Sequence, residues 1–507
     1  MSSALSGIAS ILTPTTLLLM LGGTVMGLIA GALPGISATM AVALLVPFTF
    51  SMPPLQGLAL LGAIYMSAIY GGSFSAILIN TPGTPSSIGT TFDGYPMAKQ
   101  GRGWEAIIVA TVGSVIGGIF GVIALAFLAP PLAKVALKFG PPEYFWVAVF
   151  GLTIIAMLCS KSLVKGIMGG LLGLLIGTVG IAPIGGDVRF TFGMPALQGG
   201  VELVGTMIGL FCLPEVLAMI LEGSDKRYER MDIGRRQGIL WEVTKKVLAQ
   251  PQNLLRSSII GTVVGIIPGA GGSIANLVSY NEAMRASKHP EKFGTGLIDG
   301  VIATETANNA TVGGGLIPLL TLGVPGTPVD AVIYAGLLIH GLQPGARLFT
   351  HFGDITYGFI FSIFVATVMM LPVGLLLGNA LHKLVSQLSV RILAPSIMFL
   401  SIIGSYAIRN NIMDVWVMLA CGTLGFLLKI LKVDPAPVVL GLVLGPLAEQ
   451  GFVQGLLIGR AQGIGYGIFF TRPVSILLIV MTVVSLVWPF VSAWSRKRRE
   501  KGAGANA

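Results

Sequence analysis

Long apolar segments alternate with short polar breaks along almost the whole chain. Residues 106–129, 355–371 and 473–494 approach or reach the length of about 20 residues that an α-helix needs to cross a bilayer. Similar runs recur from one end of the sequence to the other. This pattern predicts an all-α polytopic membrane protein with roughly 10 to 14 membrane segments, some of them of half length.

Some apolar stretches are too short to span a bilayer. Residues 36–50 and 313–324 are bounded by glycine and proline, and we expect them to form half-helices or re-entrant arms. The first apolar run, residues 15–33, is expected to remain as a membrane helix. No charged residue precedes Asp93, so the basic region of a cleaved signal peptide is missing.

Two unusual motifs each occur twice and in the same order. Gly-x-x-x-Gly followed by Pro-Gly covers residues 27–35 and again 261–269, and Gly-Gly followed by Pro-Gly-Thr-Pro covers 71–85 and again 314–328. Secondary transporters are often built from such repeats, with broken helices at corresponding places. The repeats predict four parts: a first membrane repeat over 1–222, a charged connecting loop over 223–256, a second membrane repeat over 257–495 and a basic tail over 496–507.

Composition agrees with the hydropathy pattern. Hydrophobic residues make up 54% of the chain and charged residues 10%, and the mean hydropathy is +0.86. Soluble domains carry about 25% charged residues. The net charge of +10 comes largely from lysine and arginine in the connecting loop and the tail. The positive-inside rule therefore predicts that both are cytoplasmic, and the charge does not indicate a nucleic-acid partner.

The repeated breaks are the candidate substrate site. A break in a membrane helix frees backbone N–H groups that attract an anion at a helix N-terminus, and carbonyl groups that suit Na⁺. We expect Gly83 and Gly326 to line the substrate cavity at equivalent places. The alternative is that Pro-Gly-Thr-Pro is only a tight turn between helices. The candidate substrate-binding residues are Gly35, Ser37, Asn80, Thr81, Gly83, Thr84, Gly271, Gly272, Ser273, Gly326 and Thr327.

A polar island in the second half is the candidate coupling-ion site. It contains Thr304, Glu305, Asn308 and Asn309, directly before a Gly-Gly-Gly run. An ionisable group at membrane depth is costly and is therefore a functional candidate. Its hard oxygen atoms suit Na⁺, and Glu305 could instead carry a proton. The alternative is a helix N-terminus in a polar loop, with Thr304 as the cap and Glu305 in the first turn.

The sequence contains no recognisable motif for catalysis, metal binding or ATP hydrolysis. The four histidines are scattered without metal-ligand spacing, and neither a G-x-S-x-G nor a Walker A motif is present. We therefore expect no enzymatic activity, no metal site and no organic cofactor. The energy for transport must then come from an ion gradient or from another subunit.

These motifs resemble the TctA family, the large membrane subunit of tripartite tricarboxylate transporters, through nearly the whole chain. The resemblance is carried by residues 27–35, 70–73, 80–85, 93–97, 268–276, 305–309 and 323–328. It implies inverted repeats and secondary active uptake of citrate-like tri- or dicarboxylates, coupled to Na⁺ or H⁺. It also implies a multi-pass location in the bacterial inner membrane.

The resemblance implies partners as well. They are a small membrane subunit of the TctB type and a periplasmic solute-binding protein of the TctC type, with a small carboxylate as substrate and membrane lipid around the chain. Two other classes stay open: a carboxylate channel or exporter that works without a binding protein, and a membrane enzyme acting on a lipid-linked substrate. The missing catalytic motifs count against the enzyme.

Overall fold

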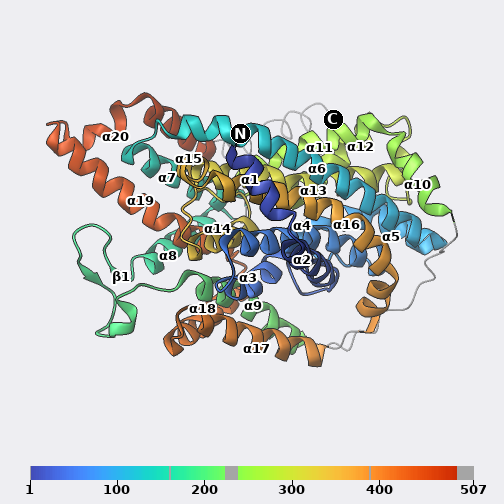
Figure 1. Ribbon diagram of the computed structural model, residues 1–507, viewed down its shortest axis with the longest axis horizontal. Helices are drawn as coiled ribbons and strands as arrows, with labels where there is room; N and C mark the ends of the chain where they lie inside the picture. The colour runs from blue at the N-terminus through green and yellow to red at the C-terminus, as the bar shows by residue number, and fades with distance from the viewer. Residues whose placement is uncertain (1, 159–161, 223–237, 388–389, 488–507) are drawn as a thin grey trace, which may run out of the picture. The chain divides into compact units, whose positions relative to one another are not determined.

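The computed structural model describes residues 2–158, 162–222, 238–387 and 390–487, and these residues are overwhelmingly helical (Figure 1). The first part of the connecting loop, residues 223–237, and the basic tail lie outside the described residues, so the predicted cytoplasmic location of both remains a prediction. The chain divides into two compact units, one formed by Met1–Ala136 with Glu202–Leu431 and the other by Leu137–Val201 with Lys432–Ala507. Each predicted half therefore contributes to both units.

The first unit contains most of the helices. They are α1 (Ser2–Ile11), α2 (Pro14–Ala32), α3 (Ala38–Thr49), α4 (Pro54–Ile79), α5 (Thr90–Met97), α6 (Gly103–Ala136), α9 (Leu203–Glu222), α10 (Ile239–Leu248), α11 (Pro251–Ile266), α12 (Gly271–Ala286), α13 (Ile298–Leu322), α14 (Pro328–Ile339), α15 (Ala346–His351), α16 (Gly353–Gln387), α17 (Val390–Arg409) and α18 (Ile412–Ile430). Short turns η1 (Pro85–Ser87), η2 (Ala98–Arg102) and η4 (Pro290–Lys292) join some of them.

The second unit is smaller. It contains α7 (Pro141–Leu158), α8 (Leu163–Gly177), the two-stranded hairpin β1 (Gly180–Ile181) and β2 (Val188–Arg189), η3 (Pro195–Leu197), α19 (Ala436–Ala461), η5 (Gly465–Gly467), α20 (Ile468–Thr471) and a helix over Pro473–Val487. α19 packs against α7 and α8. Within this unit the buried Glu143 forms an ion pair of 2.8 Å with Arg472, and Arg189 forms one of 2.8 Å with Glu449.

Among the described residues, eight helices are long and apolar enough to cross a membrane, or up to nine if a bent pair counts as one span. The bent pair is Gly465–Thr471 with Pro473–Val487, at 74°. The predicted all-α polytopic fold is therefore confirmed, and the chain is a multi-pass membrane protein. The first apolar run forms α2, as expected.

The two short segments of the sequence pattern have different outcomes. The segment at residues 36–50 is the 12-residue helix α3, too short to span, as predicted. The prediction for residues 313–324 was wrong, because residues 313–322 are the last part of the continuous 25-residue helix α13 and not a separate half-helix. The glycine run does not break α13. Its small residues instead let neighbouring helices approach, since a Cβ on Gly313 would lie 2.1 Å from the backbone of Gly121 in α6.

Glycine-mediated packing is the same in the two halves. In the first half, a Cβ on Gly31 of α2 would lie 2.1 Å from the Ala68 oxygen of α4. In the second half, a Cβ on Gly265 of α11 would lie 2.7 Å from the Thr311 oxygen of α13. Since lipid offers no hydrophobic drive for helix association, such close backbone contact is what holds α2 to α4 and α11 to α13.

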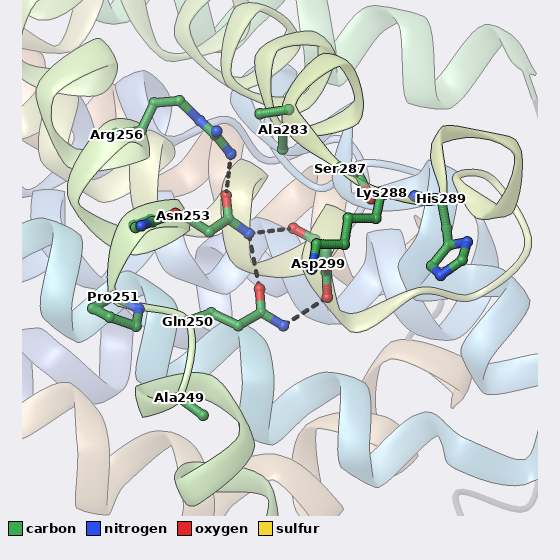
Figure 2. A pocket seen from close by; sticks show the side chains of 12 residues that line it. Ala249, Gln250, Pro251, Asn253, Arg256, Ala283, Ser287, Lys288, His289 and Asp299 are labelled. Atoms are coloured by element: carbon green, nitrogen blue, oxygen red, sulfur yellow. Dashed lines mark hydrogen bonds between the residues drawn. The ribbon is translucent and has the colours of Figure 1, made fainter.

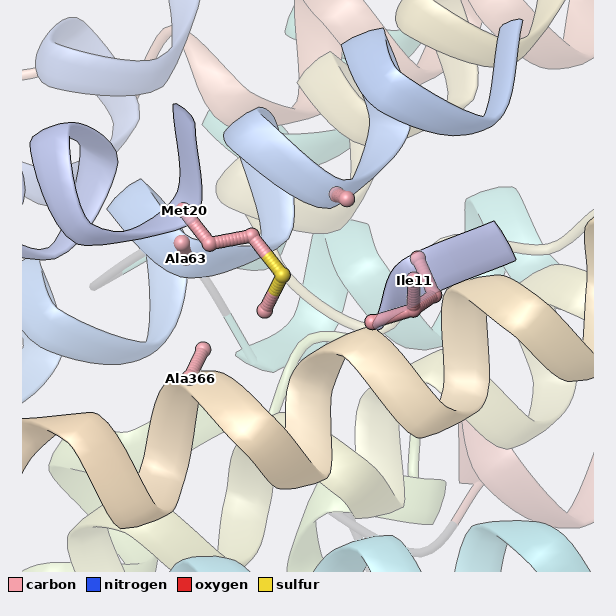
Figure 3. Close-up of a cluster of buried hydrophobic side chains, with 5 residues drawn as sticks. Ile11, Met20, Ala63 and Ala366 are labelled. Atoms are coloured by element: carbon pink, nitrogen blue, oxygen red, sulfur yellow. The ribbon is translucent and has the colours of Figure 1, made fainter. Parts of the chain in front are cut away.

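An apolar cluster joins the N-terminal helices to α16. Figure 3 shows Met20 of α2 between Ala63 of α4 and Ala366 of α16, with Ile11 of α1 nearby. All of these side chains are fully buried. The contacts show that α1 and α2 pack inside this unit, on the same helices that carry the candidate site.

Candidate functional site

Each half contains a break directly after its most buried helix. α4 is followed by Asn80 and α13 by Gly323, and both of these capping residues are in the left-handed conformation, with φ of 56° and 73°. We call the following residues, 80–84 and 323–327, the first and second break loops. A left-handed residue stops a helix sharply because the next N–H turns back to a carbonyl of the last turn. The two Pro-Gly-Thr-Pro motifs thus end helices in the same way.

Glycine lies against backbone in both break loops. A Cβ on Gly83 would lie 2.1 Å from the Gly31 oxygen, and one on Gly326 would lie 2.9 Å from the Gly265 oxygen. The Gly326 carbonyl also accepts the Gly269 amide at 2.6 Å. Packing alone thus requires a residue without a side chain, so a role of either glycine in binding substrate stays a prediction.

The second break loop starts a helix and carries a buried carboxylate. Thr327 is the N-cap of α14 and accepts the Asp330 amide at 3.1 Å. The Asp330 carboxylate, fully buried, accepts from the Thr327 hydroxyl at 2.8 Å and from Tyr65 of α4 at 3.0 Å. The first half therefore supplies a phenol to an acid of the second half.

The N-terminus of α12 faces residues of both halves. A Cβ on Gly272 would lie 2.6 Å from the Ser86 Cβ and 3.1 Å from the Asn308 Oδ1, and one on Gly271 would lie 3.4 Å from the Thr327 Cγ2. The side chain of Asn276 on α12 accepts the Gly89 amide at 2.8 Å. The helix N-terminus, whose amides attract anions, therefore lies beside the turn after the first break loop and beside the second break loop.

Glu305 lies in the middle of α13 and is fully buried. Its carboxylate accepts hydrogen bonds from the Thr90 hydroxyl and, at 3.0 Å, from the Ser114 hydroxyl, both from the first half. The Thr90 hydroxyl also lies 3.1 Å from that of Thr304. The alternative that Thr304 caps a helix in a polar loop is therefore wrong, because α13 begins at Ile298 and its polar residues are enclosed by α6 and α11.

The two asparagines of the same helix contact the first half through their amide nitrogens. Asn308 donates to the Ile69 oxygen at 3.3 Å and Asn309 to the Met66 oxygen at 3.1 Å, both on α4. Their side-chain oxygens are buried and have no hydrogen-bond partner among the described residues. A buried acceptor without a partner is costly, and residues three and four positions after Glu305 lie on its side of the helix. These oxygens and the Glu305 carboxylate suit a cation.

The remaining predicted residues lie in less central positions. Gly35 links α2 to α3 with a φ of 92°, close to the Met219 side chain of α9, and Ser37 caps α3 by accepting the Met40 amide at 3.2 Å. Thr81 donates to the Ile79 oxygen at 3.3 Å. Thr84, buried behind Ser86, lies 3.1 Å from its hydroxyl. Asn80 is exposed and Ser273 is half-buried in the first turn of α12.

Several site residues were not identified from the sequence. Tyr65 and Ser114 lie in apolar segments and Thr90 lies in a short polar stretch, and all three gain importance only from acids that follow more than 190 positions later. Asp330 had a signal that was missed, since an acid occurs two residues after the second Pro-Gly-Thr-Pro motif inside an apolar run. Asp93 is also buried but accepts three backbone amides, of Gly294, Gly296 and Leu297, and so fastens a loop.

Comparison with known proteins gives one family. The model of the tripartite tricarboxylate transporter TctA family matches residues 17–440. An uncharacterized 52.8 kDa protein of Agrobacterium vitis, from the TAR-I ttuC' 3' region, is 37% identical over 493 residues, which are 97% of this chain and 96% of that protein. An uncharacterized protein from the TAR-II ttuC' 3' region of the same organism is 34% identical over 238 residues, 47% of this chain and 97% of that protein.

Proposed function

Since the chain belongs to the tripartite tricarboxylate transporter TctA family, we propose that it is the large permease subunit of such a transporter. In this proposal it takes up a citrate-like tri- or dicarboxylate across the bacterial inner membrane by secondary active transport. A small TctB-type membrane subunit completes the membrane part, and a TctC-type periplasmic protein captures and delivers the substrate.

The observation that carries the proposal is the buried Glu305 with its hydroxyl donors and the unpartnered oxygens of Asn308 and Asn309. Within the described ranges no basic side chain forms an ion pair with Glu305. A fully buried carboxylate of this kind is expensive in a membrane protein unless an ion or a proton compensates it. The oxygens around it are the hard ligands that Na⁺ prefers. Coupling to Na⁺, or to H⁺ carried on Glu305, is the function that these groups support best.

The substrate end of the proposal rests on the neighbouring α12 N-terminus. Gly271 and Gly272 place no side chain over the first amides of this helix, and the Ser86 and Thr327 side chains lie beside them. Amides and hydroxyls at a helix N-terminus bind carboxylates through hydrogen bonds and the helix dipole. Asn308, which contacts this terminus and shares the face of Glu305, connects the proposed anion and cation sites.

Uptake by the complete three-component system tests this proposal. Vesicles containing both membrane subunits, given the periplasmic protein and labelled citrate, are energised by a Na⁺ gradient or by a pH gradient. We expect uptake that needs the binding protein and one of the gradients, and a loss of at least about tenfold in Glu305→Gln, the change expected when about 1.4 kcal/mol of coupling is lost. Glu291→Gln, an exposed acid of η4, is the matched control.

Two results would decide against the proposal. Wild-type ion dependence in Glu305→Gln, with normal citrate binding to the periplasmic protein, removes Glu305 from coupling. Downhill carboxylate flux through the membrane subunits alone, with no need for a gradient or a binding protein, identifies a channel or an exporter.

A further inference from the structure

A large cavity lies away from the break loops, at the other end of the helices that form the second half of the site. It is open on one side and is bordered by the start of α11, the end of α12 and the start of α13 (Figure 2). Its volume is about 700 Å³. Its polar lining consists of Gln250, Gln252, Asn253, Arg256, Ser287, Lys288, His289 and Asp299. The proposed transport mechanism does not use this cavity.

The acid of the cavity is already engaged by amides. Gln250 donates to the Asp299 carboxylate at 2.6 Å, and Asn253 donates to the Asp299 backbone oxygen at 3.1 Å and to the Gln250 oxygen at 3.2 Å. Figure 2 shows these three side chains as one connected group on one side of the cavity. This group engages Asp299 and leaves Arg256 and Lys288 as the permanently charged side chains that can face a ligand.

Those cations lack acidic partners. Arg256 donates to the Asn253 side-chain oxygen at 3.0 Å, while its Nε is buried and finds no acceptor in the described part of the chain. Among the residues that the structure describes, neither Arg256 nor Lys288 forms an ion pair with an acid. The first turn of α11 adds amides that the helix itself leaves free, at the positive end of its dipole. The cavity therefore offers more positive than negative charge.

The surroundings of the cavity are typical of a membrane surface. Helix α10, which ends at the cavity, buries Val243 and Val247 against the protein but leaves Leu240, Trp241 and Leu248 between 45% and 65% exposed. Its Lys246 lies 3.6 Å from Glu105, in the first turn of the long membrane helix α6. An amphipathic helix with an exposed tryptophan at the end of a membrane span is typical of the lipid headgroup region.

We propose that this cavity binds the phosphate of an anionic phospholipid. The Arg256 guanidinium and the Lys288 ammonium hold the phosphate oxygens, and the acyl chains leave over the exposed apolar side chains of α10. A basic pocket between membrane helices beside an interfacial helix is a suitable headgroup site. Free phosphate or a small carboxylate is also an anion that Arg256 and Lys288 could bind. Neither has apolar chains that would contact the exposed Leu240, Trp241 and Leu248.

Native mass spectrometry of the delipidated full chain tests the site. Phosphatidylglycerol and phosphatidylcholine with identical acyl chains are titrated separately, and inorganic phosphate and citrate are added as soluble competitors. We expect preferential retention of phosphatidylglycerol, weakened about fivefold in Arg256→Gln and in Lys288→Gln, as expected when one cation is removed near an anionic lipid. Lys292→Gln, an exposed cation outside the lining, is the matched control and should bind as wild type.

Three outcomes would overturn the proposal. They are equal retention of the two lipids, unchanged lipid binding in both glutamine variants, and displacement of the lipid by millimolar phosphate or citrate, which would assign the cavity to a soluble anion. Lys288 is exposed, so Lys288→Gln carries the test even if Arg256→Gln fails to fold. None of these measurements involves uptake, so the result is independent of the proposed transport function.

Discussion

The first and second break loops share a backbone design, whereas the residues that follow them differ in charge. Both loops begin with a left-handed residue and pack a glycine against the backbone of an earlier helix. Two residues after the second proline of each Pro-Gly-Thr-Pro motif, the first half has Ser87 and the second has Asp330. Ser87 donates to the Gly72 oxygen at 3.0 Å, but Asp330 accepts from hydroxyls of both halves.

The difference follows from what each loop begins. The first leads into η1, a turn of three residues, while the second leads into α14, a helix of 12 residues. A helix of that length presents free amides and a dipole that stabilise a carboxylate in its first turn, and a single turn does not. Steric packing thus explains the common backbone of the two break loops. Of Ser87 and Asp330, only Asp330 is charged, and it lies at a helix N-terminus that compensates its charge.

The largest expected effect is a loss of folding when the close backbone contact is filled. In Gly83→Val the new Cβ would lie 2.1 Å from the Gly31 oxygen. We expect the free energy of unfolding to fall by more than about 3 kcal/mol, the upper range for overpacking. Gly326→Val, with 2.9 Å to the Gly265 oxygen, should lose less. Thermal unfolding of the purified protein in detergent measures both.

Gly22→Val is the control for that pair, because nothing lies within 4 Å of its Cβ position. It should unfold at nearly the wild-type temperature. A larger loss of stability in Gly326→Val than in Gly83→Val would show that the second break loop is packed more closely than the first. It would contradict the order that the two distances predict.

The next largest effect is expected at the carboxylate. Asp330→Asn replaces one carboxylate oxygen with an NH₂ group, which cannot accept from the Thr327 or Tyr65 hydroxyl. We expect the free energy of unfolding to fall by about 2 to 3 kcal/mol. Chemical denaturation followed by the fluorescence of the tryptophans measures the loss. A variant as stable as wild type would mean that the charge is not what these hydroxyls stabilise.

A smaller effect is expected from the phenol across the halves. Tyr65→Phe removes one donor to Asp330 and should cost about 1 to 2 kcal/mol. In the Asp330→Asn background the same substitution should cost clearly less, because the two residues act as a pair. Additive losses in this double-mutant cycle would rule out the inferred coupling between the halves.

The smallest effect is expected in the first half. Ser87→Ala removes a neutral hydroxyl that donates to the Gly72 and Thr84 oxygens, and we expect a loss of about 1 kcal/mol or less. The same denaturation measurement applies. A loss equal to that of Asp330→Asn would remove the energetic difference between the loops.

The position of the breaks could be predicted from the sequence, but their neighbours could not. The paired Pro-Gly-Thr-Pro motifs correctly indicated where α4 and α13 are followed by irregular backbone, because proline and glycine act locally. The same reasoning failed at residues 313–315. Three glycines weaken an isolated helix, yet in α13 they permit contact with α6 and α11, and this packing outweighs propensity.

The sequence by itself determined the membrane class, the helical content, the order of the repeated motifs and the candidacy of Glu305, since each depends on composition, local spacing or the cost of a charge in an apolar run. Only the tertiary structure decided which groups meet. It buried Glu305 in mid-helix against Thr90 and Ser114, and it joined Tyr65 to Asp330. Such contacts depend on how helices far apart in the sequence pack, and neither hydropathy nor a local motif encodes that arrangement.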